Sequence, residues 1–214
     1  MKLTVIYDND LLRKDLKPDW GFSCLVETNE NLKVLFDTGF KPSILIGNME
    51  KLGINPKTIN FVVISHPHLD HTGGLKDFLR LNSKATVYVP QSFPEFLENV
   101  KMVKVKNSLK ISENLIIVED SKEFEQFLLA KTSKGYILIT GCSHPGLEKM
   151  IFEASKFGKI FGVVGGFHGF NDFKVLENIS FVCPCHCTIH KKEIAKIFPE
   201  KYVECGVGKV LEIV

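Results

Sequence analysis

Residues 66–71, with the pattern His-x-His-x-Asp-His, constrain this chain more than any other segment. In an extended segment successive side chains alternate between faces, so His66, His68 and Asp70 are expected to point the same way. His71 joins them only if the backbone turns at Asp70. Imidazole and carboxylate groups together suit Zn²⁺ or a similar divalent ion, and a single ion has little room for four of them. The segment therefore predicts two metal ions side by side.

The flanks of this segment place it at the end of a β-strand. Residues 60–64 are typical of a buried strand, and residues 72–75 of a turn into a helix. Proteins of the α/β class commonly place their chemistry at the carboxyl ends of strands. The alternative is a set of ordinary loop histidines, which is disfavoured because three of the seven histidines fall within six residues.

Length and composition limit the classes to which the chain can belong. A length of 214 residues suits one well-buried domain, expected to span residues 1–214. The formal net charge of +2 suggests neither a nucleic acid nor a membrane as partner. The first residues lack a signal-peptide pattern, and no apolar run approaches the ~20 residues of a membrane span. We expect a cytoplasmic protein whose six cysteines are reduced.

The hydrophobic pattern predicts an α/β fold in which strands come first and then alternate with helices. The expected strands are residues 2–7, 22–28, 33–37, 60–64, 85–89, 124–132, 136–140, 160–164, 180–183, 201–205 and 207–213, with further short strands between 102 and 118. The expected helices are residues 42–52, 74–81, 94–99 and 145–157.

Three further histidines follow predicted strands, as the first cluster does. They are His144, His168 and His186. One such residue alone would be read as structural, but three at the same topological position make coincidence a weak explanation. Asp37 also ends a strand, where it could hold a ligand imidazole by its free N–H or instead cap the following turn. His190 is expected near the start of a helix, as a structural or supporting residue.

Three cysteines alternate around His186. Their spacing does not match the usual zinc loops, which separate the first pair by two to four residues. If the preceding strand continues, Cys183, Cys185 and Cys187 face one side and His186 the other. We expect His186 to be a metal ligand and the cysteines to be packed thiols.

These residues, in this order, resemble the metallo-β-lactamase superfamily. The match extends over essentially the whole chain, from residues 37–39 through residues 66–71 to the three later histidines. The resemblance implies a four-layer αββα sandwich with the metal site at one edge between the sheets. It also implies two divalent ions, two Zn²⁺ in the first place, with Mn or Fe also compatible. One ion would be bound by His66, His68 and His144, and the other by Asp70, His71 and His186.

Shorter phrases resemble one branch, which includes the 7,8-dihydropterin-6-methyl-4-(β-D-ribofuranosyl)aminobenzene-5′-phosphate synthases and many proteins described only as metal-dependent hydrolases. The phrases are residues 8–9, 21–23, 141–146, 165–168 and 184–188. The chain departs from the family pattern at His168, where most superfamily hydrolases have an aspartate that bridges the two ions. It is also short for this branch between residues 75 and 141.

The leading hypothesis is a metal-dependent hydrolase that uses metal-bound hydroxide on a small phosphorylated or diphosphate-bearing substrate. Asp70 would orient the nucleophile as well as bind metal, and His168 would protonate the leaving group or bind an anionic oxygen. The nearest competing hypothesis is a transferase that condenses a dihydropterin diphosphate with an arylamine ribofuranosyl phosphate. A nuclease, or a thiol-dependent metal sensor without catalytic activity, fits the sequence less well. We expect a small-molecule substrate rather than a nucleic acid.

Overall fold

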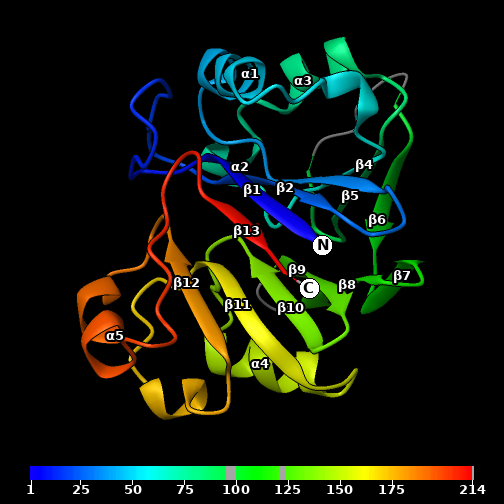
Figure 1. The fold of residues 1–214 in the computed structure, drawn as a ribbon. Helices are drawn as coiled ribbons and strands as arrows, with labels where there is room; N and C mark the ends of the chain where they lie inside the picture. Colours follow the sequence, from blue (N-terminus) through cyan, green and yellow to red (C-terminus); the bar gives the residue numbers. More distant parts are fainter. Residues whose placement is uncertain (95–99, 121–123, 214) are drawn as a thin grey trace.

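The strands assemble into two sheets in the computed structural model, which describes residues 1–94, 100–120 and 124–213 (Figure 1). In spatial order the first sheet contains β13 (Val210–Glu212), β1 (Lys2–Tyr7), β2 (Ser23–Glu27), β3 (Lys33–Phe36), β4 (Phe61–Val63), β5 (Thr86–Pro90) and β6 (Met102–Val105). The second contains β12 (Phe181–Cys185), β11 (Ile160–Gly166), β10 (Gly135–Thr140), β9 (Glu125–Thr132), β8 (Leu115–Asp120) and β7 (Ser108–Ser112). Strands β3 to β6 are parallel neighbours, and so are β10, β11 and β12.

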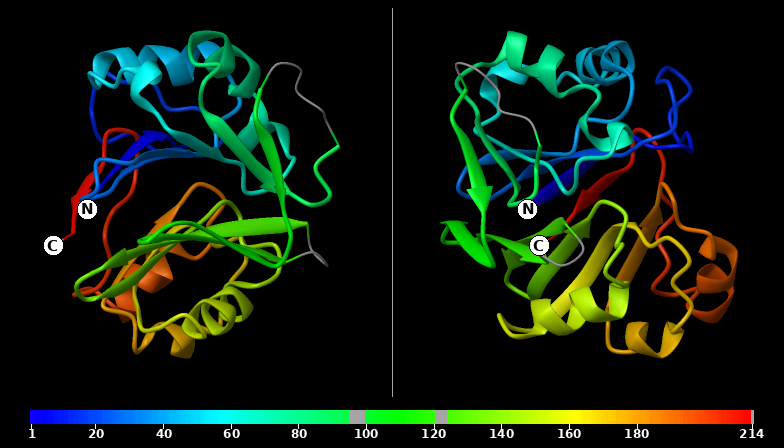
Figure 2. Two further views of the ribbon diagram at one scale, coloured as in Figure 1. Left: turned by 90° about the vertical axis from the view of Figure 1, so that its right-hand side faces the viewer. Right: turned by 180° about the vertical axis from the view of Figure 1, so that it is seen from behind.

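Helices cover the outer faces of both sheets, which gives the expected αββα sandwich (Figure 2). The first sheet is covered by α1 (Pro42–Lys51) and α3 (Leu75–Leu81), and the second by α4 (Leu147–Ser155) and α5 (Lys191–Ile197). The short helix α2 (Leu69–Thr72) and the 3-10 turns η1 (Pro56–Thr58) and η2 (Phe173–Leu176) lie in connections. None of the helices formed by the described residues has the length and apolar character of a membrane span.

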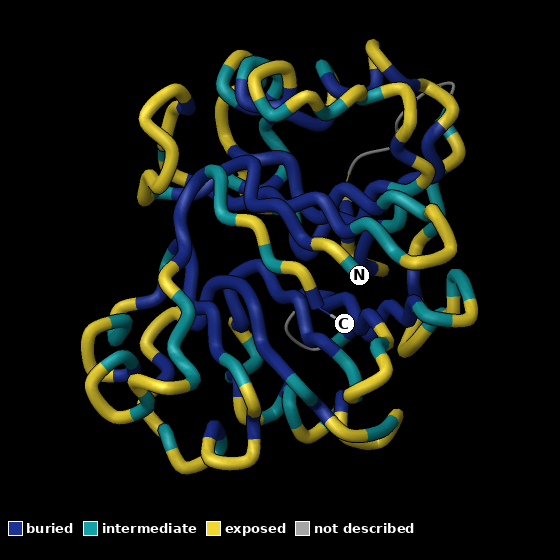
Figure 3. The backbone as a smooth tube through the Cα atoms, viewed as in Figure 1, coloured by how far each residue is buried: buried dark blue, intermediate teal, exposed yellow. Residues whose placement is uncertain are grey.

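An apolar layer between the sheets joins them. It includes Val5, Phe36 and Val63 of the first sheet and Ile117 and Ile139 of the second, all of them completely buried. In Figure 3 the buried parts of the backbone follow the strands, and the exposed parts lie mainly in the outer turns. Since full burial of such a side chain contributes about 1.5–3 kcal/mol, the strands form a firm base for the groups at their ends.

Most predicted elements are present with ends shifted by one or two residues, but the strand predicted over residues 201–205 is wrong. Tyr202 forms only an isolated bridge with Val182. The chain then leaves the second sheet for the first, where the Val207 N–H donates to the Asp10 carbonyl (2.8 Å). This crossing prevents a continuous ladder. The helix predicted over residues 94–99 falls almost entirely outside the described residues.

Candidate metal centre

The carboxyl ends of strands from both sheets meet at one edge of the sandwich. Parallel pairing aligns the ends of β3 and β4 in one sheet and those of β10, β11 and β12 in the other. The six expected metal ligands follow these strands, and the structure brings them together in two groups of three. We call His66, His68 and His144 the open triad, and Asp70, His71 and His186 the buried triad.

The open triad presents three imidazoles to a common point. Their ligand atoms all lie within 4.8 Å of one another. The ring centroids of His66 and His68 are 4.6 Å apart, and those of His68 and His144 are 5.0 Å apart. His66 Nε2 is buried and has no hydrogen-bond partner, although buried polar atoms normally have one. Three imidazole nitrogens, one of them the buried and unpartnered His66 Nε2, fit a divalent ion such as Zn²⁺.

The buried triad combines a carboxylate with two imidazoles. Asp70 Oδ2 lies 3.2 Å from His186 Nε2 and 3.7 Å from His71 Nε2. The side chains of His71 and His186 are completely buried, and that of Asp70 is 17% exposed. An anion with two nitrogen donors fits a second divalent ion.

Buried oxygen atoms hold the imidazoles of the open triad. Glu125 Oε2 accepts from His144 Nδ1 (2.7 Å) and from the His144 backbone N–H (2.8 Å). Ser65 Oγ contacts His66 Nδ1 (2.8 Å) and donates to Asp37 Oδ2 (2.7 Å), so it accepts from the imidazole. Both contacts fix the ring and the tautomer, so that Nε2 is the unprotonated nitrogen of each ring and the one that can bind metal.

The buried triad has its own supporting groups. Asp37 Oδ2 accepts from His71 Nδ1 (2.7 Å), which is the first of the two roles that the sequence left open for this aspartate. Asn9 Oδ1 accepts from His186 Nδ1 (3.0 Å), and the Asn9 amide donates to the His186 carbonyl (3.1 Å). Each Nε2 is therefore turned toward Asp70.

Burial and charge together set the protonation states at this edge. Burial lowers the pKa of both His66 and His71 to about 3, so these imidazoles are neutral and able to bind metal at neutral pH. Burial raises the pKa of Asp37 to about 7. Burial also raises the pKa of Asp70 and Glu125, but the contacts and charge interactions with the neighbouring histidines together outweigh it and hold both pKa values well below their usual range.

The backbone of residues 66–71 turns earlier than the alternating pattern predicts. Helix α2 begins directly after His68, so Asp70 and His71 lie on a helical turn and not on an extended strand. The turn is fixed by the first sheet, because Thr38 donates to the His71 carbonyl from both its backbone N–H (2.7 Å) and its hydroxyl (2.8 Å). The Phe22 N–H donates likewise to the Asp70 carbonyl (3.2 Å).

His168 lies beside the open triad and outside both groups of three. It is exposed, and its ring centroid is 4.8 Å from that of His144. Burial lowers its pKa. His190 lies apart from both triads, at the start of α5, where its Nδ1 is 3.5 Å from a carboxylate oxygen of Glu193.

The three cysteines around His186 do not share one side, and that prediction is wrong. Strand β12 ends at Cys185, and His186 adopts a left-handed conformation with φ 45°. Cys183 and Cys185 therefore pack with Cys205 in the interior, whereas Cys187 turns toward the metal centre. The thiols of Cys185 and Cys205 are 2.6 Å apart.

Left-handed backbone conformations recur around the centre. In addition to His186, they occur at Asp37 (φ 55°), Ser143 (φ 60°) and His168 (φ 47°). A residue with a Cβ is destabilised there by roughly 1–2 kcal/mol. Four such residues near one site show that the surrounding contacts impose the geometry.

Several supporting residues carried no signal strong enough to assign them from the sequence. Glu125 stands in no recognisable motif. It reaches His144 only through the pairing of β9 with β10, which no local sequence pattern indicates. Asn9 lies within one of the family-like phrases, but nothing indicated its contact with His186. Ser65 immediately precedes His66, and Cys142 stands two residues before His144. This proximity to expected ligands was the only signal in the sequence for a supporting role.

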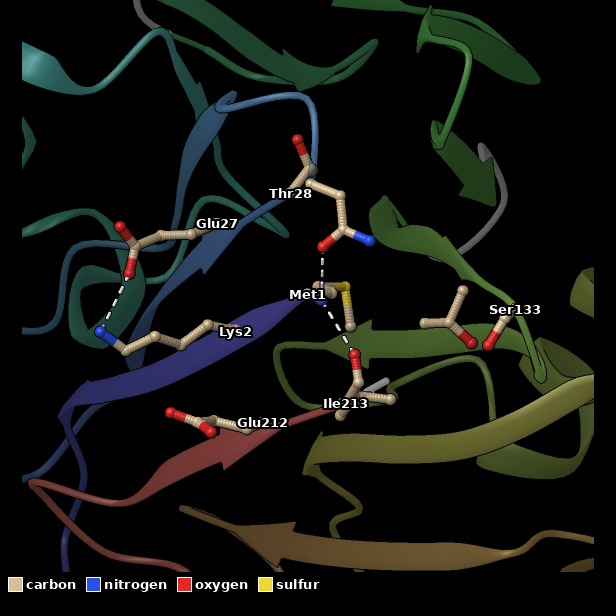
Figure 4. Close-up of a pocket in the computed structure, with 9 residues that line it drawn as sticks. Met1, Lys2, Glu27, Thr28, Ser133, Glu212 and Ile213 are labelled. Atoms are coloured by element: carbon tan, nitrogen blue, oxygen red, sulfur yellow. Dashed lines mark hydrogen bonds and ion pairs between the residues drawn. The ribbon is translucent and has the colours of Figure 1, made fainter.

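Two clefts differ in their relation to the centre. A cleft of about 320 Å³ is lined by His144 and His168 and also by Glu148 and Asp172. A larger cleft, of about 570 Å³, lies at the opposite end of β1 (Figure 4). Its lining includes Met1, whose amino group donates to the Ile213 carbonyl, and contains no histidine or cysteine among the described residues. The smaller cleft is therefore the candidate substrate site.

Exposed apolar side chains surround the centre. Trp20 is 56% exposed, and its ring centroid is 4.9 Å from that of His186. Leu69 stands between two ligands and is 68% exposed, and Ile189, whose N–H donates to the His168 carbonyl, is 70% exposed. We call these three side chains the apolar rim. Exposed apolar groups next to a polar site are typical of ligand binding.

Comparison with known proteins shows the family and the fold of the chain. The model of the metallo-beta-lactamase superfamily matches residues 18–144, which is more than half of the chain. A 7,8-dihydropterin-6-methyl-4-(beta-D-ribofuranosyl)-aminobenzene-5'-phosphate synthase from Methanocaldococcus jannaschii is 28% identical, over 91% of each chain. The crystal structure of Tm1679, a metal-dependent hydrolase of the beta-lactamase superfamily, has a TM-score of 0.80 and 27% identity, covering 100% of this chain and 99% of that one. Human tRNase Z, short form, shares the fold, with a TM-score of 0.66 and 13% identity over both whole chains.

Proposed function

Because this chain belongs to the metallo-β-lactamase superfamily, we propose that it is a metal-dependent hydrolase whose open triad and buried triad each hold one divalent ion, with Zn²⁺ the first candidate. The observation that carries the proposal is the orientation of the imidazoles. In His66, His71, His144 and His186 a protein oxygen accepts from Nδ1, which makes Nε2 the unprotonated nitrogen that can bind a metal ion.

Two ions bound there would lower the pKa of a water molecule and neutralise charge that develops on a substrate oxygen. The side chains supply the remaining chemistry. The partly exposed Asp70 carboxylate can orient the attacking water. His168 lines the 320 Å³ cleft beside the open triad, where its imidazole N–H can donate a hydrogen bond to an anionic oxygen of the substrate.

The charges around the centre bear on the proposed substrate class. We assign the site a small phosphorylated or diphosphate-bearing molecule, whose anionic group would lie against the two ions. The cleft itself contains Glu148 and Asp172 and, among its described lining residues, no lysine or arginine. The part of the substrate in the cleft is therefore neutral or cationic, and the apolar rim can contact the organic portion.

The test measures metal content and then hydrolysis. Protein purified without added metal or a histidine tag should contain about two ions per chain by mass spectrometry. Incubation with dihydropterin diphosphate should release the free pterin alcohol, and metal removal by a chelator should abolish the release. Failure to bind metal, or full turnover without it, would contradict the proposal.

A transferase is the second candidate, favoured by one observation. The relative from M. jannaschii that aligns over 91% of both chains is a synthase. The same incubation separates the two reactions when an arylamine ribofuranosyl phosphate is added. A condensed product that forms only with this acceptor indicates transfer, whereas pterin alcohol formed at an unchanged rate indicates hydrolysis.

A further inference from the structure

Cys142 lies between the two triads. Its side chain is buried, and Sγ is 3.2 Å from His71 Nε2. The same sulfur lies within 4.8 Å of ligand atoms of His66 and His144 in the open triad and of His71 and His186 in the buried triad. One thiol is thus within reach of both candidate ion positions.

The strand register explains how a cysteine comes to this place. Strands β10 and β11 pair in parallel with Thr140 opposite Gly165, so Cys142 lies alongside Phe167 at the strand ends. Phe167 is buried in the apolar cluster on the outer side of the second sheet, and His168 lies beside the open triad. The residues at the end of β11 therefore place no anionic side chain between the triads. The segment after the neighbouring strand β10 places the Cys142 thiol there.

Close packing fixes the main chain on which Cys142 stands. A Cβ at Gly141 would lie 2.2 Å from Ser65 Oγ, so only glycine permits this approach of β10 to the first sheet. The Cys142 N–H donates to Glu125 Oε1 (2.9 Å). The position of the thiol is consequently determined by the same network that holds His66 and His144.

Charge and ligand type both favour a thiolate here. Two divalent ions bring four positive charges, whereas Asp70 is the only anion within the two triads. A thiolate between them would add a second anion, and sulfur is a preferred ligand of Zn²⁺. The unpartnered Nε2 of His66, which is buried and faces the same point, is an independent sign that an ion belongs there.

We propose that the Cys142 thiolate is a metal ligand shared by the two triads, in place of the bridging aspartate that the family resemblance leads one to expect from the end of β11. The proposal rests on the metal centre proposed above. It adds a sulfur ligand from a different strand, which changes the spectroscopic signature of the centre and its sensitivity to oxidants.

The test uses Co²⁺ in place of the native metal, with a reductant that contains no thiol. Visible d–d absorption reports that Co²⁺ is bound, and a near-ultraviolet sulfur-to-cobalt charge-transfer band reports a thiolate ligand. We expect both in the wild type. The Cys142→Ser variant should lose the charge-transfer band, and the neighbouring variant Cys187→Ser should keep it. In Cys142→Asp, visible absorption and a stoichiometry of two ions should persist without the band.

The outcomes separate this proposal from the proposed function. Visible absorption without the charge-transfer band in the wild type overturns the thiolate ligand and leaves the metal centre intact. If the band survives in Cys142→Ser and disappears in Cys187→Ser, the thiolate ligand is Cys187 and not Cys142. This outcome also overturns the proposal. Absence of any cobalt absorption contradicts the metal centre, and with it both proposals.

Discussion

The open and buried triads differ in their access to solvent and in the groups that hold them. In the open triad His68 is exposed and the His144 side chain is 27% exposed. In the buried triad both imidazoles are completely enclosed. One triad therefore faces the candidate substrate cleft, and the other lies in the interior.

The side chains that hold the imidazoles also differ between the two triads. Glu125 holds the ring of the open triad that lies beside the cleft, whereas Asp37 holds the fully enclosed ring of His71. The comparison teaches that substrate access and metal retention can be divided between two halves of one centre. An ion in the open triad should exchange faster than one in the buried triad, because water can reach its ligands.

The largest expected effect follows from removing the carboxylate of the buried triad. Asp70→Asn keeps the shape of the side chain but removes the charge between His71 and His186. We expect kcat/KM to fall on the order of 10²-fold or more, measured on dihydropterin diphosphate at saturating metal. Asp77→Asn is the matched control, since Asp77 pairs with Arg80 on α3. Equal activity of both variants would remove Asp70 from the mechanism.

Substitution of the supporting carboxylates sharpens the contrast between the triads. Asp37→Asn should weaken mainly the ion of the buried triad, because Asp37 contacts His71 directly and His66 only through Ser65. Glu125→Gln should weaken the ion of the open triad, and each effect should be about 10–100-fold. Titration of metal-free protein with a competing chelator measures both affinities. Trp20 is the only tryptophan of the chain and lies next to His186, so its fluorescence should report the buried ion. If Asp37→Asn weakened the ion of the open triad more than that of the buried triad, the division into two triads would be wrong.

The buried triad should also make the metal-free fold sensitive to acid. Burial lowers the pKa of His71 from 6.5 to about 3, so below pH 6.5 the unfolded chain binds a proton that the folded chain does not. This contribution to stability is fully present above pH 6.5 and is lost as the pH falls toward 3. As the pH is lowered, the free energy of unfolding of His71→Gln should decrease less steeply than that of the wild type. The two slopes should differ by about 1.4 kcal/mol per pH unit.

Urea unfolding of the chelator-treated proteins between pH 6.5 and pH 4.5 measures this difference. His190→Gln is the control, because it removes a histidine outside both triads and should keep the slope of the wild type. Identical slopes for His71→Gln and the wild type would show that this imidazole takes up its proton in the folded state.

The smallest expected effect concerns the apolar rim. Trp20→Ala should raise KM about fivefold, which corresponds to about 1 kcal/mol of apolar contact, and leave kcat unchanged. The control Phe152→Ala removes an aromatic side chain that is 63% exposed on α4. A fall in kcat for Trp20→Ala would show that the ring positions His186 and does not merely contact substrate.

The parts of the centre that could be predicted from the sequence are those built from contiguous residues. His66, His68, Asp70 and His71 stand together, and a strand precedes them, so their convergence follows from local geometry. The later histidines could be placed because parallel strands align their carboxyl ends. Their roles as ligands remain predictions, although the structure brings all six side chains together.

The remainder depends on contacts between distant segments. Glu125 reaches His144 through strand pairing, and Asn9 reaches His186 across the two sheets, so no local pattern identifies either contact. The interpretation of residues 183–187 failed because β12 stops at Cys185 and the next residue takes a left-handed conformation. Periodicity predicts a continuing strand, but it does not indicate where tertiary contacts end that strand.

The residues around the centre that adopt left-handed backbone conformations lower the stability of the fold, so their retention indicates selection for function. A glycine or asparagine at Ser143, His168 or His186 would relieve backbone strain and raise thermal stability. A library of variants screened only for resistance to heat should therefore enrich such residues at these positions. Enrichment there would identify, without any assay of catalysis, the positions at which function and stability make opposite demands on the chain.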